Sequence, residues 1–196
     1  DYFRTSFNAC QMAFKELEKT MTDIYSKDRR PINATIIGVG GAAQSAAKAL
    51  EIIGDGAFLG KNIPGIVIKM LSRTITYSKE LMIPILTDTD ILVDASRRTG
   101  DDLKKSIIEN KLLRYLPEHT IICDISLDCY SDDGQLKPFE GTVCGSLSKP
   151  VIYPDDERYD IQLPEGIDST NRRITVGCDA WPGITPKESI LHYENI

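Results

Sequence analysis

The feature that most constrains the fold is a short run of glycine and alanine, Gly38-Val39-Gly40-Gly41-Ala42-Ala43. An apolar, strand-like segment at residues 34–39 leads into it, and an alanine-rich segment at residues 42–53 with helical character follows it. Glycine permits the tight turn that joins the two, and a small residue at the start of the helix lets the helix lie close to a sheet. The sequence therefore predicts a buried strand, a glycine turn and a slim helix in direct succession.

This run has the spacing G-x-G-x-x-A, a variant of the dinucleotide-binding fingerprint. In that fingerprint the first glycine makes the turn, the second leaves room for a pyrophosphate, and the free N–H groups of the helix N-terminus face the phosphates. Close packing without a ligand demands similar residues, so that alternative stays open. We favour cofactor binding because strands and helices continue to alternate after the turn. The candidate residues are Gly38, Gly40, Gly41, Ala42 and Ala43.

The rest of the chain alternates between helix-like and strand-like segments. Apolar residues recur every three or four positions from Phe3 to Ile24, which predicts a leading helix to about Lys27 with Thr5 and Ser6 as candidate caps. This stripe suits packing on the protein's own core or on a neighbouring domain better than a coiled coil. Further strands are expected at residues 66–71, 90–94, 120–125 and 174–178, helices at 78–86, 101–115 and 186–193, and loops at 54–65 and 129–172. The alternation predicts an α/β, Rossmann-like, doubly wound fold with a mostly parallel sheet.

Composition and charge exclude several classes of function. Asp plus Glu outnumber Lys plus Arg by 29 to 23, so the net charge is −6, which argues against a nucleic-acid partner. No apolar run is long enough for a transmembrane helix and no signal peptide is visible, so we expect a cytoplasmic protein without a membrane partner. The five cysteines are odd in number and lack C-x-x-C spacing, which predicts reduced thiols and no metal site rather than a disulfide framework.

The end of the second predicted strand bears on the choice of cofactor. It is followed by Ser72, Arg73 and Thr74, with no carboxylate that would bond a ribose 2′-hydroxyl. The guanidinium of Arg73 suits a 2′-phosphate, with which it can form paired, charge-assisted hydrogen bonds. We therefore favour NADP over NAD, while a solvated surface arginine is the alternative.

The ends of the third and fourth predicted strands are expected at the same edge of the sheet. They carry the segments Ala95-Ser96-Arg97 and Ser126-Leu127-Asp128. Asp128 is the candidate catalytic residue, because a carboxylate there can handle a proton or orient a ligand. An Asx-type turn is the structural alternative for Asp128, and a solvated turn is the alternative for Arg97 and Arg98.

Four segments, taken together with the glycine turn, resemble the family of alanine dehydrogenases and pyridine nucleotide transhydrogenases, which includes saccharopine-type dehydrogenases. These segments are residues 90–98, 116–119, 123–128 and 181–186. The similarity extends from the first predicted helix to the last. Its most specific part is the P-G-x-x-P spacing of Pro182, Gly183 and Pro186 in combination with the glycine turn.

The resemblance implies roles for the candidate residues. The glycine turn would hold the pyrophosphate, Ser72 and Arg73 would flank the adenosine ribose, and Ala95 and Ser96 would lie near the adenine. At the other end of the cofactor, Asp128 matches an aspartate that lies near the nicotinamide in alanine dehydrogenases. Ala180 and Trp181 stand where the family has an Asn-Met pair that contacts nicotinamide, and Ala180 departs from that pattern.

The resemblance also implies an enzyme in which a substrate domain precedes the cofactor domain. We accordingly divide the chain into a leading helix at residues 1–31, which serves as a linker or interface, and an NAD(P)-binding Rossmann domain at residues 32–196, and expect the substrate domain upstream. The full enzyme is expected to transfer a hydride between the nicotinamide cofactor and an amino or imino acid and to form a homo-oligomer, whereas this chain alone is expected to be inactive. The alternative is a non-catalytic nucleotide-binding or oligomerisation module.

Overall fold

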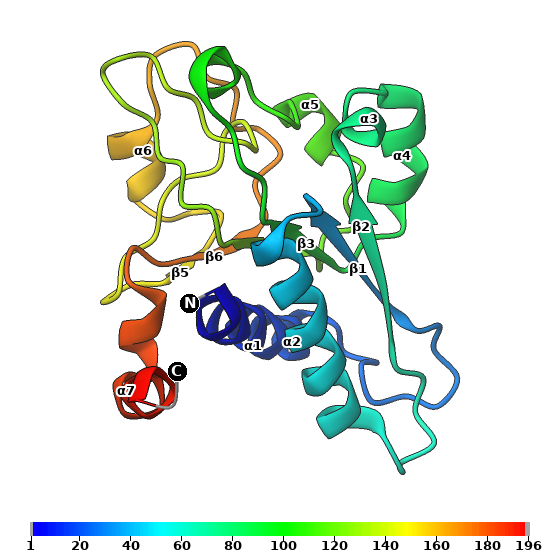
Figure 1. Cartoon of the computed structure of the whole chain (residues 1–196). Helices are drawn as coiled ribbons and strands as arrows, with labels where there is room; N and C mark the ends of the chain where they lie inside the picture. Colours follow the sequence, from blue (N-terminus) through cyan, green and yellow to red (C-terminus); the bar gives the residue numbers. More distant parts are fainter. Residues whose placement is uncertain (1, 195–196) are drawn as a thin grey trace.

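The computed structural model describes residues 2–194 and contains one six-stranded sheet with helices on both faces (Figure 1). The strands are β1 (Ile32–Ile37), β2 (Ile66–Leu71), β3 (Ile91–Asp94), β4 (Ile121–Asp124), β5 (Val151–Ile152) and β6 (Ile174–Gly177). They lie in the order β2-β1-β3-β4-β6-β5, and every neighbouring pair is parallel except β5 with β6. The predicted α/β fold with a mostly parallel sheet is confirmed.

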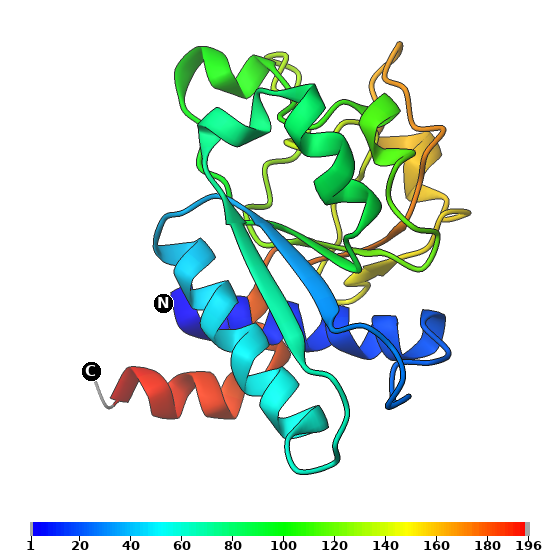
Figure 2. The same ribbon diagram turned by 90° about the vertical axis from the view of Figure 1, so that its right-hand side faces the viewer.

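The helices form a layer on each side of the sheet, as Figure 2 shows. Helices α1 (Tyr2–Thr20) and α2 (Gly41–Phe58) cover one face, and α3 (Arg73–Thr76), α4 (Lys79–Thr87) and α5 (Asn110–Leu113) lie on the other. The remaining helical elements are α6 (Arg158–Gln162), α7 (Pro186–Glu194) and the 3-10 helices η1 (Gly100–Lys104) and η2 (Trp181–Ile184). Among the described residues, no helix is both long and apolar enough to cross a bilayer.

The strands bury both of their faces because successive side chains point to opposite sides. Ile36 of β1 and Val93 of β3 belong to the core shared with α1 and α2. Ile37 and Leu92, one position away on the same strands, belong to the core shared with α4 and α5. This double burial explains why the strands lack polar alternation in the sequence.

The leading helix α1 packs beside α2 on the sheet, which confirms that its apolar stripe faces the protein's own core. Small residues let the two helices approach closely: the Ser6 hydroxyl donates a hydrogen bond to the Ala42 carbonyl, and Cys10 Sγ lies 3.9 Å from the Ala46 carbonyl oxygen. The predicted caps are wrong, because Thr5 and Ser6 lie inside the helix. The helix also ends at Thr20 rather than near Lys27.

Two other predicted boundaries are wrong for reasons of packing. Helix α2 continues to Phe58 through part of the predicted loop, and Gly54 lies on its buried side, where a Cβ would be 2.9 Å from the Ile66 side chain. The predicted helix at residues 101–115 is broken into η1 and α5. Between them the chain is extended, since the amides of Ile107 and Ile108 donate to the Pro138 carbonyl.

The predicted loop at residues 129–172 contains β5 and α6 around a small core of its own, with Val143, Ile152 and Tyr159 buried. Cys129 and Cys144 form a disulfide within this segment, so the prediction of five reduced cysteines is wrong. Their spacing gave no signal, because the pairing depends on how the loop folds back. Disulfides persist mainly in oxidising compartments, so cysteine usage no longer supports a cytoplasmic location, which stays a prediction.

The amino edge of the sheet is closed by charges around Asp90, the residue before β3. Its buried carboxylate accepts hydrogen bonds from Nη1 and Nη2 of Arg30 (2.6 and 2.9 Å) and from the Asn33 amide (2.8 Å). Nε2 of His119 lies 2.7 Å from its Oδ1. One carboxylate thus joins the segment before β1, β1 itself and the segment before β4.

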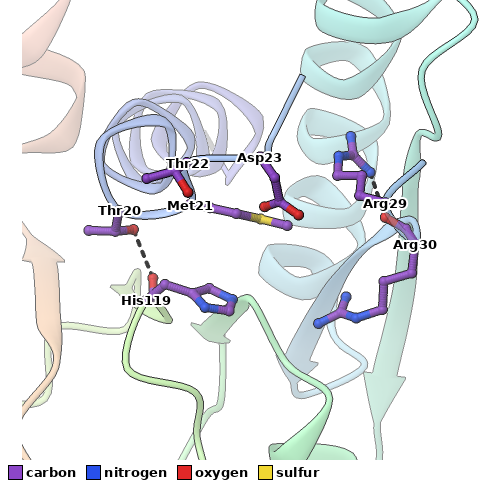
Figure 3. A pocket seen from close by; sticks show the side chains of 7 residues that line it. All are labelled: Thr20, Met21, Thr22, Asp23, Arg29, Arg30 and His119. Atoms are coloured by element: carbon purple, nitrogen blue, oxygen red, sulfur yellow. Dashed lines mark hydrogen bonds between the residues drawn. The ribbon is translucent and has the colours of Figure 1, made fainter. Parts of the chain in front are cut away.

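A hollow of about 300 Å³ adjoins this cluster and is drawn in Figure 3. Its arginines already have protein partners. Arg29 donates to the carbonyls of Ile24 (2.6 Å) and Arg30 (2.7 Å), and its guanidinium carbon lies 4.7 Å from the centre of the Phe58 ring. The hollow therefore belongs to the structural cluster that closes this edge.

We predict that Asp90→Asn lowers the free energy of unfolding by about 3 kcal/mol at pH 7, because it removes the negative charge that its partners surround. Burial raises the pKa of Asp90, but the hydrogen bonds from His119, Arg30 and Asn33 outweigh it and hold the pKa below its usual value. The loss should therefore shrink as the pH falls through the folded-state pKa. Urea unfolding measures both effects.

Asp88→Asn, which removes a half-exposed partner of Arg30, is the control and should lower the free energy of unfolding by at most about 1 kcal/mol. Equal losses for both variants would contradict this role of Asp90.

The disulfide predicts a specific count of reactive thiols. When the unfolded, unreduced protein is alkylated, mass spectrometry should show label on the three free cysteines Cys10, Cys123 and Cys178. After reduction, all five should be labelled. Five labels without prior reduction would show that the Cys129–Cys144 pair does not form.

Candidate functional site

A cleft of about 610 Å³ opens at the carboxyl ends of β1, β2 and β3. Strand β1 has β2 on one side and β3 on the other, so the chain reverses its direction of winding at this point. Open α/β sheets bind their ligands at such a switch point, outside the carboxyl ends of the strands. The lining is mixed, with apolar side chains from Ile37, Leu71, Ile107, Leu112 and Leu136.

The glycine turn forms one wall of the cleft. Gly38 has a φ of +123°, and a Cβ there would lie 2.6 Å from the carbonyl oxygen of Ala95. Both the backbone conformation and the close approach of the two strand ends therefore require glycine. Gly40 differs, because its φ is −79° and a Cβ there would meet nothing within 4 Å. The absence of a side chain at Gly40 keeps the cleft open, and the packing of the protein does not require that absence.

The N-terminus of α2 begins at this turn with unoccupied donors. Gly40 is the N-cap and provides no side-chain acceptor for the first-turn amides. The first N–H groups of an α-helix have no partner within the helix, and the helix dipole adds a partial positive charge there. Gly41 faces the ring of Tyr2 in α1, 3.3 Å from the position of a Cβ. The arrangement is one that accepts an anion beside Gly40.

The end of β2 places Ser72 and Arg73 on the cleft, while Thr74 does not line it. Nη1 of Arg73 forms an ion pair with Oδ2 of Asp102 in η1 at 3.0 Å. Lys79, Arg97 and Lys105 add further positive charge to the lining, and Asp102, Glu109 and Glu140 add negative charge. The cleft thus contains cations and hydroxyls that suit an anionic, sugar-bearing ligand, together with three carboxylates.

A buried polar network lies behind the cleft, at the ends of β3 and β4. Asp94 and Asp124 are paired in register and share one neighbour, because Ser126 Oγ donates to Asp94 at 2.7 Å and lies 3.4 Å from Asp124. Ser96 Oγ donates to the other oxygen of Asp94 (2.7 Å), and the buried Lys137 ammonium donates to Asp124 (2.6 Å). Burial and the neighbouring Asp124 raise the pKa of Asp94 to about 6.

The predicted catalytic residue, Asp128, lies outside the lining of the cleft and faces Arg98. Nε and Nη2 of the buried Arg98 donate to one oxygen of Asp128 at 3.1 and 3.0 Å. The same guanidinium donates to the carbonyls of Lys105 and Leu136, so it joins two loops beside the cleft. Arg98 is therefore not part of a solvated turn, whereas Arg97 is exposed and lines the cleft.

The other predicted residues divide into two groups. Those on the cleft are Gly38, Gly40, Ser72, Arg73, Ala95, Ser96 and Arg97. Those that do not line it are Gly41, Ala42, Ala43, Thr74, Ser126, Leu127, Asp128, Ala180 and Trp181. Leu127 has a φ of +54° and its amide donates to Asp124, while Trp181 is buried and its Nε1 donates to the Asp124 carbonyl. The roles of both groups in binding or catalysis stay predictions.

The sequence did not point to several residues that line the cleft. Asp102 and Lys105 come from the segment predicted as one long helix, and Leu136 comes from a predicted loop. Their positions depend on the hydrogen bonds of Arg98, a long-range arrangement that leaves no local pattern. Among the side chains that the structure describes, no group of three or more His, Cys, Asp or Glu is arranged to hold a metal ion.

Comparison with known proteins gives similarity in fold only. No protein-family model matches the sequence. No curated protein matches it at a significant level.

Solved structures resemble the chain at low sequence identity. One of them, from the dipicolinate synthase of Bacillus halodurans, is 16% identical with a TM-score of 0.42, over 100% of this chain and 55% of that one. D-mandelate dehydrogenase from Rhodotorula graminis is 10% identical with a TM-score of 0.42, over 98% and 60%. An NADPH-dependent glyoxylate/hydroxypyruvate reductase from Sinorhizobium meliloti is 13% identical with a TM-score of 0.37, over 61% and 66%. The chain thus spans between half and two thirds of the length of these proteins.

The raised pKa of Asp94 predicts a pH-dependent effect of Asp94→Asn. Protonation of Asp94 stabilises the folded state fully below about pH 4, and this contribution is lost as the pH rises through about 6. The free energy of unfolding of the variant, relative to the unmodified protein, should therefore increase by about 2 kcal/mol between pH 4 and pH 7. Chemical unfolding at the two pH values measures this difference. A difference independent of pH would show that Asp94 titrates normally.

Proposed function

We propose that this chain is the NAD(P)-binding domain of an amino-acid dehydrogenase similar to alanine dehydrogenase. One observation carries the proposal: the glycine turn lines the cleft at the switch point of the sheet and leads directly into the uncapped N-terminus of α2. A side chain at Gly40 would fill the space beside the turn. The protein's own packing leaves that space open, so the absence of a side chain there suits a ligand. When bound, the nicotinamide supplies the hydride chemistry, and the protein supplies binding and orientation.

Different residues of the cleft would bind different parts of the cofactor. The amides at the start of α2 would bind the pyrophosphate next to Gly40, because they are uncapped and carry the positive end of the helix dipole. Ser72 and Arg73 would bind the adenosine ribose at the end of β2. Ala95 and Ser96, which also line the cleft, would lie along the adenine side.

We further propose that the cofactor is NADP rather than NAD. The lining residues that follow β2 directly are a hydroxyl and a guanidinium, Ser72 and Arg73, with no carboxylate for a ribose 2′-hydroxyl. Arg97 and Lys105 lie on the same cleft and add charge that attracts a 2′-phosphate. The amino-acid substrate, its separate binding domain and the homo-oligomer rest on the family resemblance alone.

A second function is favoured by the position of Asp128. Because this carboxylate is paired with Arg98 and does not line the cleft, a module that binds the dinucleotide without catalysing hydride transfer also accounts for the geometry. The two functions differ in one assay. Production of NAD(P)H from L-alanine by the full-length native protein would support the dehydrogenase, and cofactor binding without turnover would support the module.

The proposal predicts that Gly40→Leu folds normally and loses dinucleotide binding. The φ of Gly40 suits any L-residue and a Cβ there meets open space, so the free energy of unfolding should change by no more than about 1 kcal/mol. The added side chain would occupy the space of the pyrophosphate and weaken NADPH binding at least about a hundredfold. Calorimetric titration of NADPH and NADH measures the affinity, and circular dichroism checks the fold.

Gly56→Leu is the matched control, because Gly56 also has open space around it and lies in α2 away from the cleft. It should bind NADPH as the unmodified protein does. Equal binding by Gly40→Leu and Gly56→Leu would contradict the pyrophosphate site, and absence of binding by the unmodified protein would contradict the proposed function as a whole.

A further inference from the structure

The ion pair between Arg73 and Asp102 lies in the lining of the cleft. Nη1 of Arg73 is 3.0 Å from Oδ2 of Asp102, and the two side chains come from different elements, since Arg73 follows β2 and Asp102 belongs to η1, after β3. The Arg73 side chain is 60% exposed, and that of Asp102 is 34% exposed, so both are accessible to a ligand. The guanidinium that the proposed function assigns to a 2′-phosphate is therefore already bound to a carboxylate of this chain.

Asp102 is held in this position by buried contacts. Arg98, whose side chain is only 2% exposed, donates to the carbonyls of Asp102 (3.4 Å) and Lys105 (2.8 Å). Its own position is set by the ion pair with Asp128. The backbone of Asp102 and of the segment that follows it is thus attached to buried Arg98.

The charges around this pair decide how it responds to a ligand. The cleft lining contains the cations Arg73, Lys79, Arg97, Arg98 and Lys105 and the carboxylates Asp102, Glu109 and Glu140. A phosphate that binds Nη1 of Arg73 displaces Asp102 from it, and a phosphate on another N–H of the same guanidinium still lies near the Asp102 carboxylate, which repels it. A 2′-hydroxyl has no such conflict, because a carboxylate accepts its hydrogen bond.

We propose that Asp102 is a specificity-determining residue, which supplies from η1 the carboxylate that the end of β2 lacks. It favours a ribose 2′-hydroxyl by accepting its hydrogen bond and opposes a 2′-phosphate by holding Arg73. Arg73 and Asp102 therefore act against each other, and the preference for NADP over NAD depends on both. This inference rests on the proposed function, since it assumes that the adenosine ribose binds at the end of β2.

The test is the affinity of Asp102→Asn for NADPH and NADH, measured by calorimetry or by nucleotide fluorescence at low salt. NADPH should bind about tenfold more tightly than to the unmodified protein, because Arg73 is released and the repelling charge is gone. NADH should bind equally or up to about threefold more weakly. The same contrast should hold between adenosine 2′,5′-bisphosphate and 5′-AMP, which differ only in the 2′-phosphate.

Asp101→Asn is the matched control. Asp101 is the exposed neighbour of Asp102 in the same 3-10 helix, and it does not line the cleft. It changes the net charge equally and should leave the ratio of the two affinities unchanged. A double variant, Arg73→Ala with Asp102→Asn, tests the coupling: relative to Arg73→Ala alone, its gain for NADPH should be clearly smaller, because only the loss of the repelling charge remains.

The outcomes separate this inference from the proposed function. If Asp102→Asn and Asp101→Asn shift both nucleotides equally, or if the ratio is unchanged, Asp102 does not determine specificity although the cofactor site stands. The same conclusion follows if the gain is equally large in the absence of Arg73. If the unmodified protein binds neither NADPH nor NADH, the proposed function fails and the inference fails with it.

Discussion

The close approach of β1 and β3 at their carboxyl ends is the constraint on which the site depends. Gly38 passes so near the Ala95 carbonyl that no side chain fits, and its positive φ turns the chain directly into α2. This turn puts the uncapped N-terminus of α2 at the point where the sheet reverses its winding. The same few backbone atoms thus direct the chain from β1 into α2 and form part of a cleft that can accept an anion.

The two edges of the sheet use charge in opposite ways. At the amino edge, the carboxylate of Asp90 is fully buried and surrounded by donors, so its charge serves the fold. At the carboxyl edge, Arg73, Arg97 and Lys105 line an open cleft, and the partly exposed Asp102 forms an ion pair with Arg73. Buried Arg98 also borders that cleft and binds Asp128 in the loop after β4, while buried Lys137 binds Asp124 at the end of β4.

The sequence was sufficient for the parts of the molecule that depend on local patterns. The glycine turn, the five parallel strands and the burial of the α1 stripe all follow from spacing and apolar periodicity. It was insufficient where distant residues decide the outcome. Gly54 stays helical because Ile66 packs against it, residues 105–109 are extended because they pair with the segment before Phe139, and Asp102 reaches Arg73 because Arg98 fixes its loop. None of these contacts has a signature within a short window of sequence.

The measurement that tests the central claim most directly is a titration of the isotopically labelled protein with NADPH, followed by amide chemical shifts. We expect the largest changes at the amides of residues 38–43, which form the glycine turn and the start of α2, and a second group at residues 95–97, which line the cleft. Amides around Asp90 and His119 at the opposite edge should change little. Changes that cluster at that amino edge, or an unperturbed glycine turn in the presence of bound nucleotide, would contradict the account.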